Sequence, residues 1–163
     1  MEKCNAPTPA ANARAIYRHH YPVRFADCDP AGIVFFPHYL EMLNGLVEDW
    51  FNEELGIGYA TLLIERRIGL PTVSLECQFQ APSRLGELLE FTLEVARLGR
   101  RSFTLDVECV GAGTTRVRLR QVLVTMAVDT FRSVDIPADL RAAIERWQGV
   151  AGAPTHPAQE GTG

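Results

Sequence analysis

The chain has 163 residues, a length that fits one domain with a substantial buried core. Hydrophobic residues make up 47% of it and charged residues 22%, the balance of an ordinary soluble globular protein. The net charge of −4 gives no support to a nucleic-acid partner. No apolar run approaches the roughly 20 residues of a membrane-spanning helix, so no membrane association is expected.

The four cysteines, at positions 4, 28, 77 and 109, include no CxxC pair. Because the spacing of a zinc site is absent, we expect no metal. The N-terminus lacks the charged and then apolar pattern of a signal peptide. A cytoplasmic protein with reduced thiols is therefore predicted.

The two ends of the chain differ in composition from the rest. Residues 1–14, rich in Ala, Pro, Asn and Thr, are predicted to form a flexible N-terminal arm. Residues 149–163, rich in Gly, Ala, Pro and Thr, are predicted to form a disordered tail. No linker or repeat interrupts residues 15–148, which we interpret as a single domain.

The first predicted strand covers residues 20–26, where apolar side chains recur at every second position. Residues 27–36 are predicted to form a loop, because Pro30 and Gly32 interrupt them. A long helix is predicted to begin at Pro37, since proline suits the first helical position. The apolar residues that follow have the spacing of one buried helix face: Tyr39, Leu40, Leu43, Leu46, Val47, Trp50 and Phe51.

Glycines mark the middle and the end of this helix. Gly56 and Gly58 are predicted to end it. Gly45 stands in its middle, where glycine costs about 1 kcal/mol relative to alanine. We expect a close approach of the backbone to a sheet to be the reason. A second, short helix is predicted over residues 59–67.

The remainder alternates with a period of two, as half-buried antiparallel strands do. Hairpin turns are predicted at residues 98–101 and 111–113. Three strands each present one apolar face, formed by Val73, Leu75, Cys77 and Phe79, by Phe91, Leu93 and Val95, and by Phe103, Leu105, Val107 and Cys109.

In the last long strand the apolar parity changes, which predicts a β-bulge near Arg120 and Gln121. The face of that strand formed by Arg116, Arg118 and Arg120 is expected to lie outside, on solvent or on a partner. Residues 137–147 are predicted to form a terminal helix. The order of elements is α+β, and it suggests a curved antiparallel β-sheet wrapped around a long central helix.

Residues 23–39, VRFADCDPAGIVFFPHY, resemble the 4-hydroxybenzoyl-CoA thioesterase family. The resemblance extends, more weakly, through about residue 135. The family has the hotdog fold, a sheet wrapped on a central helix, which agrees with the predicted order of elements. The resemblance implies an acyl-CoA thioesterase that needs no cofactor, because coenzyme A is part of the substrate.

The resemblance also implies the reacting groups. Asp29 corresponds to the catalytic carboxylate of the family, and the backbone N–H of Phe36 corresponds to its oxyanion donor. Such a donor makes physical sense at a helix start, where N–H groups are unpaired and the partial charge is positive. Asp29 could attack the carbonyl carbon or activate a water, and the sequence leaves both open. The resemblance also implies substrate contacts at Gly32, Phe35, Pro37 and His38.

A second group of expected contacts lies far along the chain. Arg100 and Arg101, followed by Ser102, resemble the basic turn with which the family meets the phosphates of CoA. Gly99 stands where close relatives have a further basic residue, which departs from the family pattern. The aromatic Phe36 followed by Pro37 resembles the aryl-CoA branch of the family, which implies a small aromatic acyl group such as benzoyl or 4-hydroxybenzoyl.

Each of these residues also has a structural interpretation. Asp29 before Pro30 would suit a plain turn. Asp27 is expected to be a turn or capping residue, and Cys28, between two acids, a structural thiol with a raised pKa. His38 could polarise the substrate or simply be solvated. As alternatives to Asp29, the catalytic carboxylate could lie on the helix, at Glu41 or Glu48.

Other functions remain open at this point. One is hydrolysis of a short-chain aliphatic acyl-CoA or of an acyl-carrier-protein thioester. Another is a hotdog dehydratase, which usually needs a histidine with an acidic partner. A third is a non-catalytic module that binds acyl-CoA. The resemblance further implies a homo-oligomer, a dimer of dimers whose active site draws on both subunits.

Overall fold

The computed structural model describes residues 15–150. The predicted N-terminal arm lies outside these residues, as does the predicted C-terminal tail from residue 151 onward. The last helix reaches Val150 and so includes the first two residues of the range predicted as tail.

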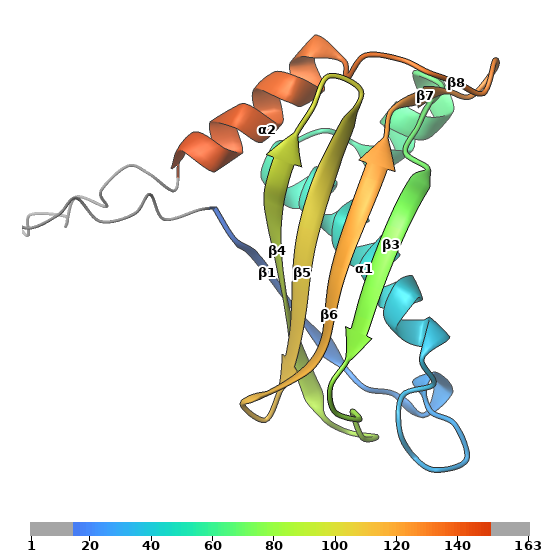
Figure 1. Cartoon of the computed structure of the whole chain (residues 1–163), viewed down its shortest axis with the longest axis vertical. Coiled ribbons are helices and arrows are strands. Elements are labelled where there is room, and N and C mark those ends of the chain that lie inside the picture. Colours follow the sequence, from blue (N-terminus) through green and yellow to red (C-terminus); the bar gives the residue numbers. More distant parts are fainter. Residues whose placement is uncertain (1–14, 151–163) are drawn as a thin grey trace, which may run out of the picture.

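Five antiparallel strands form the main sheet, in the order β1-β4-β5-β6-β3 (Figure 1). Their bounds are Tyr17–Pro22 for β1, Thr72–Phe79 for β3, Leu88–Leu98 for β4, Ser102–Gly111 for β5 and Thr114–Val124 for β6. A small second sheet joins β2 (Ile68–Gly69), β7 (Met126–Ala127) and β8 (Arg132–Ser133). Strands β1 and β3 are the two edges of the main sheet.

The helices follow the predicted pattern closely. Helix α1 runs from Pro37 to Trp50 and continues as a short π-helical turn over Phe51–Leu55, which ends at Gly56 in the left-handed conformation. A second short helix covers Thr61–Glu65, and α2 covers Ala138–Val150. Within residues 15–150, no helix is long and apolar enough to cross a membrane.

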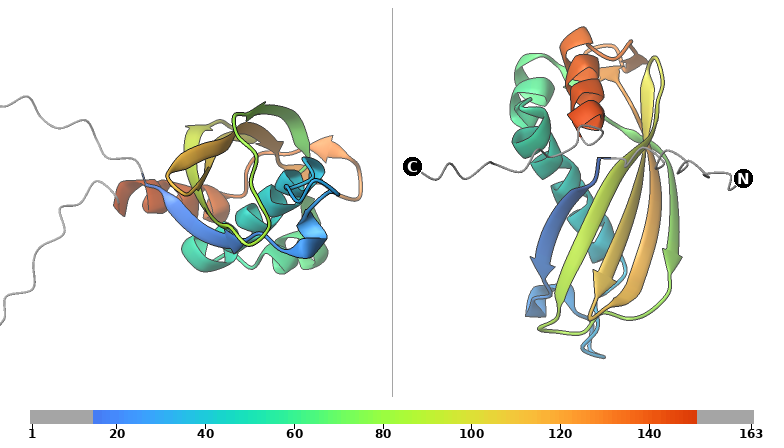
Figure 2. Two further views of the ribbon diagram at one scale, coloured as in Figure 1. Left: turned by 90° about the horizontal axis from the view of Figure 1, so that it is seen from below. Right: turned by 90° about the vertical axis from the view of Figure 1, so that its left-hand side faces the viewer.

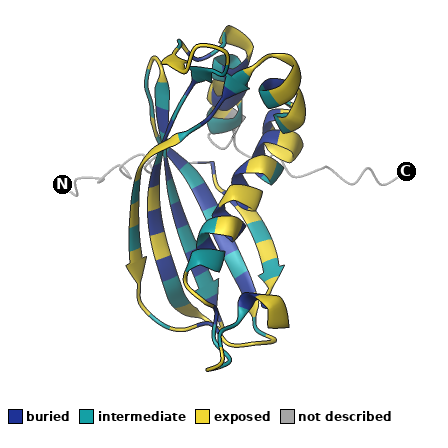
Figure 3. Cartoon of the chain, turned by 90° about the vertical axis from the view of Figure 1, so that its right-hand side faces the viewer, coloured by how far each residue is buried: buried dark blue, intermediate teal, exposed yellow. Residues whose placement is uncertain are grey.

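The core lies between the inner face of the sheet and α1, which crosses it (Figure 2). Leu43, Leu46, Val47 and Trp50 are the helix side of this core. The alternate residues of β4 and β5 are the sheet side, so buried and exposed positions alternate along each strand (Figure 3). This is the predicted curved sheet on a central helix, and the apolar faces predicted for β4 and β5 are confirmed.

The predicted first strand was placed too late in the sequence. Strand β1 ends at Pro22, and Phe25–Asp27 form one turn of 3-10 helix. The Asp27 carboxylate accepts a hydrogen bond from the Arg24 backbone N–H at 2.7 Å, which stabilises the turn. As a result Phe25 is 84% exposed and lies outside β1, although its place in the alternation predicted a residue of the first strand.

The predicted β-bulge near Arg120 and Gln121 was wrong. The pairing of β6 with β5 is continuous across these residues. Gln121 takes the core-facing position and is only 2% exposed, while Val122 lies on the outer face. The Gln121 side chain donates a hydrogen bond to the Thr72 hydroxyl at 2.8 Å. Because the buried position holds the polar Gln121 and the outer position holds the apolar Val122, the sequence pattern falsely indicated that the apolar face had changed sides.

The explanation expected for Gly45 was also wrong. Gly45 is exposed, and a Cβ atom added there would have no neighbour within 4 Å. No close approach to the sheet requires glycine at this position.

Replacing Gly45 with alanine should therefore stabilise the protein. We expect Gly45→Ala to raise the free energy of unfolding by about 1 kcal/mol, because alanine restricts the unfolded backbone and fits the helix. Urea unfolding at a fixed protein concentration measures the change. A loss of stability would mean that another surface packs on Gly45 in the assembled protein.

Candidate active site

The segment between β1 and α1 is held as a small folded loop against residues 83–85. The Val34 N–H donates to the Ser83 carbonyl at 2.9 Å, and the Leu85 N–H donates to the Gly32 carbonyl at 3.1 Å. Within the segment, Cys28 pairs with Val34 as an isolated β-bridge. These bonds fix the conformation of the chain on both sides of Asp29.

Asp29 opens a tight turn in this loop. Its carbonyl accepts the Gly32 N–H at 2.9 Å, and its Oδ1 accepts the Ala31 N–H at 2.8 Å. Gly32 has a φ of 75°, which favours glycine. Asp29 therefore takes part in a turn, which was its alternative structural interpretation. Its Oδ2 has no hydrogen-bond or ion-pair partner within residues 15–150, so one carboxylate oxygen remains available.

Phe36 is the capping residue at the start of α1, as the sequence predicted. The next two amides that could donate are occupied, since His38 N–H bonds to the Phe35 carbonyl at 2.9 Å and Tyr39 N–H to the Phe36 carbonyl at 3.2 Å. Pro37 has no N–H. The Phe36 N–H itself has no acceptor among the described residues, so it is the unpaired donor at the positive end of the helix.

Ser83 fastens the helix start, and sequence reasoning missed it. Its hydroxyl accepts a hydrogen bond from the Tyr39 hydroxyl at 2.8 Å, and its carbonyl holds Val34. Ser83 is fully buried. A lone serine in a loop gives no sequence signal for this role, which depends on a contact 44 residues away.

An aromatic cluster, Phe35, Phe36, Tyr39 and Phe79, surrounds the helix start. The ring of Phe36 lies 5.4 Å from Phe35 and 6.2 Å from Phe79, in edge-to-face contacts, and Tyr39 lies 5.9 Å from Phe79. Phe35, Phe36 and Phe79 are about half exposed. Phe79, at the end of β3, was predicted only as a core residue, because sequence alone does not bring β3 beside Phe36.

The neighbours of Asp29 have structural roles, as expected. Asp27 is 8% exposed, and its carboxylate binds the Arg24 N–H and the Tyr21 hydroxyl. Burial, followed by the nearby charges of Asp27 and Asp29, raises the pKa of the Cys28 thiol. A thiol with a raised pKa is a poor nucleophile at neutral pH.

His38 and Glu41 lie on the side of α1 that faces β1. His38 Nδ1 is 2.7 Å from Glu41 Oε2, at the edge of a cavity of about 170 Å³ between β1 and α1. Asp27 lines this cavity, and Asp29 does not. Glu48 is exposed on the same helix. His38 thus has an acidic neighbour in Glu41.

The predicted phosphate contacts lie at the other end of the sheet. Arg100 and Arg101 occupy the turn between β4 and β5, and Ser102 begins β5 (Figure 1). The Asp29 loop lies beside the opposite end of β4, since Val23 N–H bonds to the Glu87 carbonyl next to Leu88. One chain therefore does not bring Arg100, Arg101 and Ser102 together with Asp29 and Phe36.

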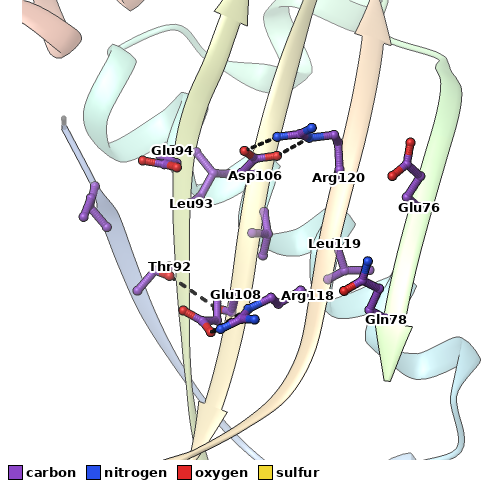
Figure 4. A pocket seen from close by; sticks show the side chains of 12 residues that line it. Glu76, Gln78, Thr92, Leu93, Glu94, Asp106, Glu108, Arg118, Leu119 and Arg120 are labelled. Atoms are coloured by element: carbon purple, nitrogen blue, oxygen red, sulfur yellow. Dashed lines mark hydrogen bonds and ion pairs between the residues drawn. The ribbon is translucent and has the colours of Figure 1, made fainter. Parts of the chain in front are cut away.

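The outer face of the sheet has a shallow hollow of about 450 Å³ (Figure 4). Two ion pairs cross its strands: Arg120 binds Asp106 at 2.7 Å, and Arg118 binds Glu108 at 2.9 Å. The third arginine of this strand, Arg116, is largely buried against Glu87 and the Pro82 carbonyl. None of the sequence-predicted site residues lines this hollow.

Residues 23–144 match the family model described as the Thioesterase-like superfamily. A 1,4-dihydroxy-2-naphthoyl-CoA hydrolase of Synechococcus elongatus is 33% identical over 93 residues, covering 56% of this chain and 68% of the relative. A 4-hydroxybenzoyl-CoA thioesterase of Pseudomonas sp. is 26% identical over 125 residues, covering 72% and 89%. The structure of a gentisyl-coenzyme A thioesterase superposes with a TM-score of 0.70 at 29% identity, covering 78% of this chain and 99% of that one.

The chain thus belongs to the Thioesterase-like superfamily, and it has the hotdog fold. The prediction of an enzyme of the acyl-CoA thioesterase class is confirmed. The relatives act on different aromatic acyl groups, so they do not identify the acyl group of this chain.

Proposed function

We propose that this protein hydrolyses an acyl-CoA with a small aromatic acyl group, such as benzoyl or 4-hydroxybenzoyl, to the free acid and CoA. The observation that carries the proposal is the unpaired Phe36 N–H at the start of α1, on the same fixed loop as the free Oδ2 of Asp29. No cofactor is required, since a carboxylate, an amide donor and water are sufficient for thioester hydrolysis.

The Phe36 amide would bind the thioester carbonyl oxygen. As the carbonyl carbon becomes tetrahedral, negative charge develops on this oxygen, and the N–H and the helix dipole stabilise it. Asp29 then either takes a proton from the attacking water or attacks the carbon itself to form a mixed anhydride, which water opens. In both routes the C–S bond breaks and the CoA thiolate leaves, to be protonated by solvent.

The aromatic cluster supports an aromatic acyl group. Phe35, Phe36 and Phe79 present half-exposed rings beside the donor amide. A flat acyl group could contact these rings edge-to-face or in an offset stack, arrangements that aromatic pairs prefer.

Asp29→Asn tests the catalytic carboxylate. We expect kcat to fall by about 10²- to 10⁴-fold, the usual contribution of a general base, because the amide neither accepts a proton nor attacks carbon. Release of free CoA from benzoyl-CoA measures the rate. Glu41→Gln and Glu48→Gln serve as controls for a carboxylate on the helix and should retain turnover. Wild-type turnover in the Asp29 variant would contradict the assigned role.

A panel of thioesters tests the acyl group. We expect kcat/KM to be highest for benzoyl-, 4-hydroxybenzoyl- or related aryl-CoA substrates, and lower for short and long aliphatic acyl-CoAs and for acyl-carrier-protein thioesters. Phe79→Ala should reduce the preference for aryl over aliphatic substrates, because it removes one ring of the aromatic cluster. A preference for aliphatic or carrier-protein substrates would favour the alternative thioesterase, and tight binding without hydrolysis would favour the binding module.

A second copy of the chain would complete the site. Between the Asp29 loop and the Arg100 turn lie the 11 residues of β4, a span of roughly 35 Å. The arm of CoA from its sulfur to the phosphorus of its ribose 3′-phosphate has about 21 bonds and reaches roughly 27 Å when extended. One substrate molecule is therefore too short to meet both ends of one subunit.

The edge strand β3 offers a way to bring the two halves together. Its Phe79 end lies at the aromatic cluster, and its Thr72 end pairs with Leu123, next to the Val124–Ser102 pair at the Arg100 turn. Antiparallel pairing of two β3 strands about a two-fold axis would place the turn end of one subunit beside the Asp29 end of the other. We propose this dimer, with a dimer of dimers as the full assembly.

Subunit mixing tests the shared site. We expect Asp29→Asn and the double variant Arg100→Ala, Arg101→Ala each to have low activity at limiting substrate. Co-refolded in equal amounts, they should recover about a quarter of wild-type activity, because half of the dimers are mixed and each of these has one intact site. If each subunit holds a complete site, no activity returns on mixing.

A further inference from the structure

The turn between β4 and β5 is built tightly around its two arginines. The Gly99 N–H donates to the Ser102 carbonyl at 2.7 Å, which leaves Arg100 and Arg101 as the two central residues. A Cβ atom on residue 99 would lie 3.0 Å from the same carbonyl oxygen. The glycine that replaces the further basic residue of close relatives thus has a structural reason, and the turn has two arginines to offer a ligand.

Both arginines share one acidic neighbour, Asp135. Arg101 Nε donates to Asp135 Oδ1 at 2.8 Å, and Arg100 Nε lies 3.5 Å from the same oxygen. Each guanidinium meets the carboxylate through Nε. The terminal N–H groups of both arginines have no hydrogen-bond partner within residues 15–150, and these are the groups that form bidentate contacts with phosphate.

Asp135 is itself fixed relative to the turn. The Ile136 N–H next to it donates to the Arg100 carbonyl at 2.9 Å, and the buried Ile136 anchors the segment in the core. The buried Thr125 links the turn to the segment that carries Asp135. Its hydroxyl lies within hydrogen-bonding distance of the Arg101 and Val134 carbonyls, at 3.1 and 2.6 Å. The backbone that carries the Asp135 carboxylate is therefore fixed relative to the turn.

Two effects of this carboxylate oppose each other. Its negative charge repels phosphate and so offsets part of the attraction of the two arginines. All three side chains are about half exposed or more, so water and salt screen this repulsion. Against this, Asp135 gathers two long, mutually repelling side chains on one side of the turn before a ligand arrives. The hydrogen bond from Arg101, together with the nearby charges of Arg100, Arg101 and Arg141, holds the pKa of Asp135 below its usual range, so it stays ionised at neutral pH.

We propose that Asp135 is a positioning residue that holds Arg100 and Arg101 with their terminal N–H groups directed at the phosphate groups of the CoA nucleotide. This inference rests on the proposed function, since it assigns the turn to the same substrate. Asp135 does not touch the reacting atoms. It acts on affinity for the nucleotide end of the substrate only.

Asp135→Asn separates positioning from a general structural role. We expect the KM for the acyl-CoA to rise about five- to tenfold with kcat unchanged, because the amide no longer fixes the guanidinium groups. The KM for the matching acyl-pantetheine thioester, which has no phosphate, should not change. Asp135→Glu should restore part of the loss. Equal effects on the two substrates, or a lower KM for the acyl-CoA, would overturn the proposal.

Asp129→Asn is the matched control. Asp129 is also an exposed acid on a nearby hairpin, bound to a single arginine, Arg67, at 2.7 Å. This variant loses the same charge and an ion pair with an arginine outside the turn, and both KM values should stay unchanged. A rise in the KM for acyl-CoA here would mean that net charge, not positioning, sets affinity.

Calorimetric titration with adenosine 3′,5′-bisphosphate tests the turn independently of catalysis. The wild-type protein should bind this probe, and Asp135→Asn should bind it about five- to tenfold more weakly, with heats of unfolding unchanged. A wild-type protein that binds the bisphosphate but hydrolyses no thioester would contradict the proposed function and leave the positioning role standing. A protein that hydrolyses acyl-CoA with no difference in bisphosphate affinity between the two forms would refute the positioning role alone.

Discussion

The packing of α1 on the inner face of the sheet is the contact on which the rest of the structure depends. Trp50 and Phe51 are fully buried against Phe103 at one end of the helix. At the other end Tyr39 meets Phe79. Each large side chain that leaves water contributes roughly 1.5–3 kcal/mol, so the helix is held along its whole length. Its first turn is thereby placed at a fixed point beside the end of β3.

Because the start of α1 is fixed, the unpaired N–H groups that every helix start has are reduced here to one defined donor, the Phe36 amide. Every helix begins with unpaired N–H groups, and most of these bind water or a capping side chain. Here Phe36 has no capping side chain, Pro37 removes one donor, and the next two amides are occupied. What remains is a single amide, flanked by aromatic rings and by the Asp29 loop. The buried hydrogen bond from Tyr39 to Ser83 keeps this geometry from shifting.

Local patterns predicted much of this arrangement. The start of α1 at Pro37, the alternation of β4 and β5 and the two hairpin turns follow from periodicity and from proline and glycine chemistry, which act within a few residues. The errors arose where a long-range contact outweighed the local pattern. Gln121 is tolerated inside because Thr72 accepts its hydrogen bond across the sheet. Phe25 is outside because Asp27 favours a tight turn over a longer strand.

The candidate site divides in the same way. The resemblance pointed to Asp29, Phe36 and the two arginines, but residue types cannot show that these groups stand at opposite ends of a sheet. Contacts between distant segments connect three further residues to the site, namely Ser83, Phe79 and Asp135. No local sequence motif predicts such contacts.

The separation of the two halves follows from the core itself. A helix of 14 residues is about 21 Å long, and strands of 10 or 11 residues are needed to cover it and the π-helical turn that follows. Strands of that length place the Arg100 turn and the Phe36 amide at opposite ends of the sheet. The proposed dimer would combine a buried core with a long substrate site, and the open edge of β3 is where such pairing would cost least.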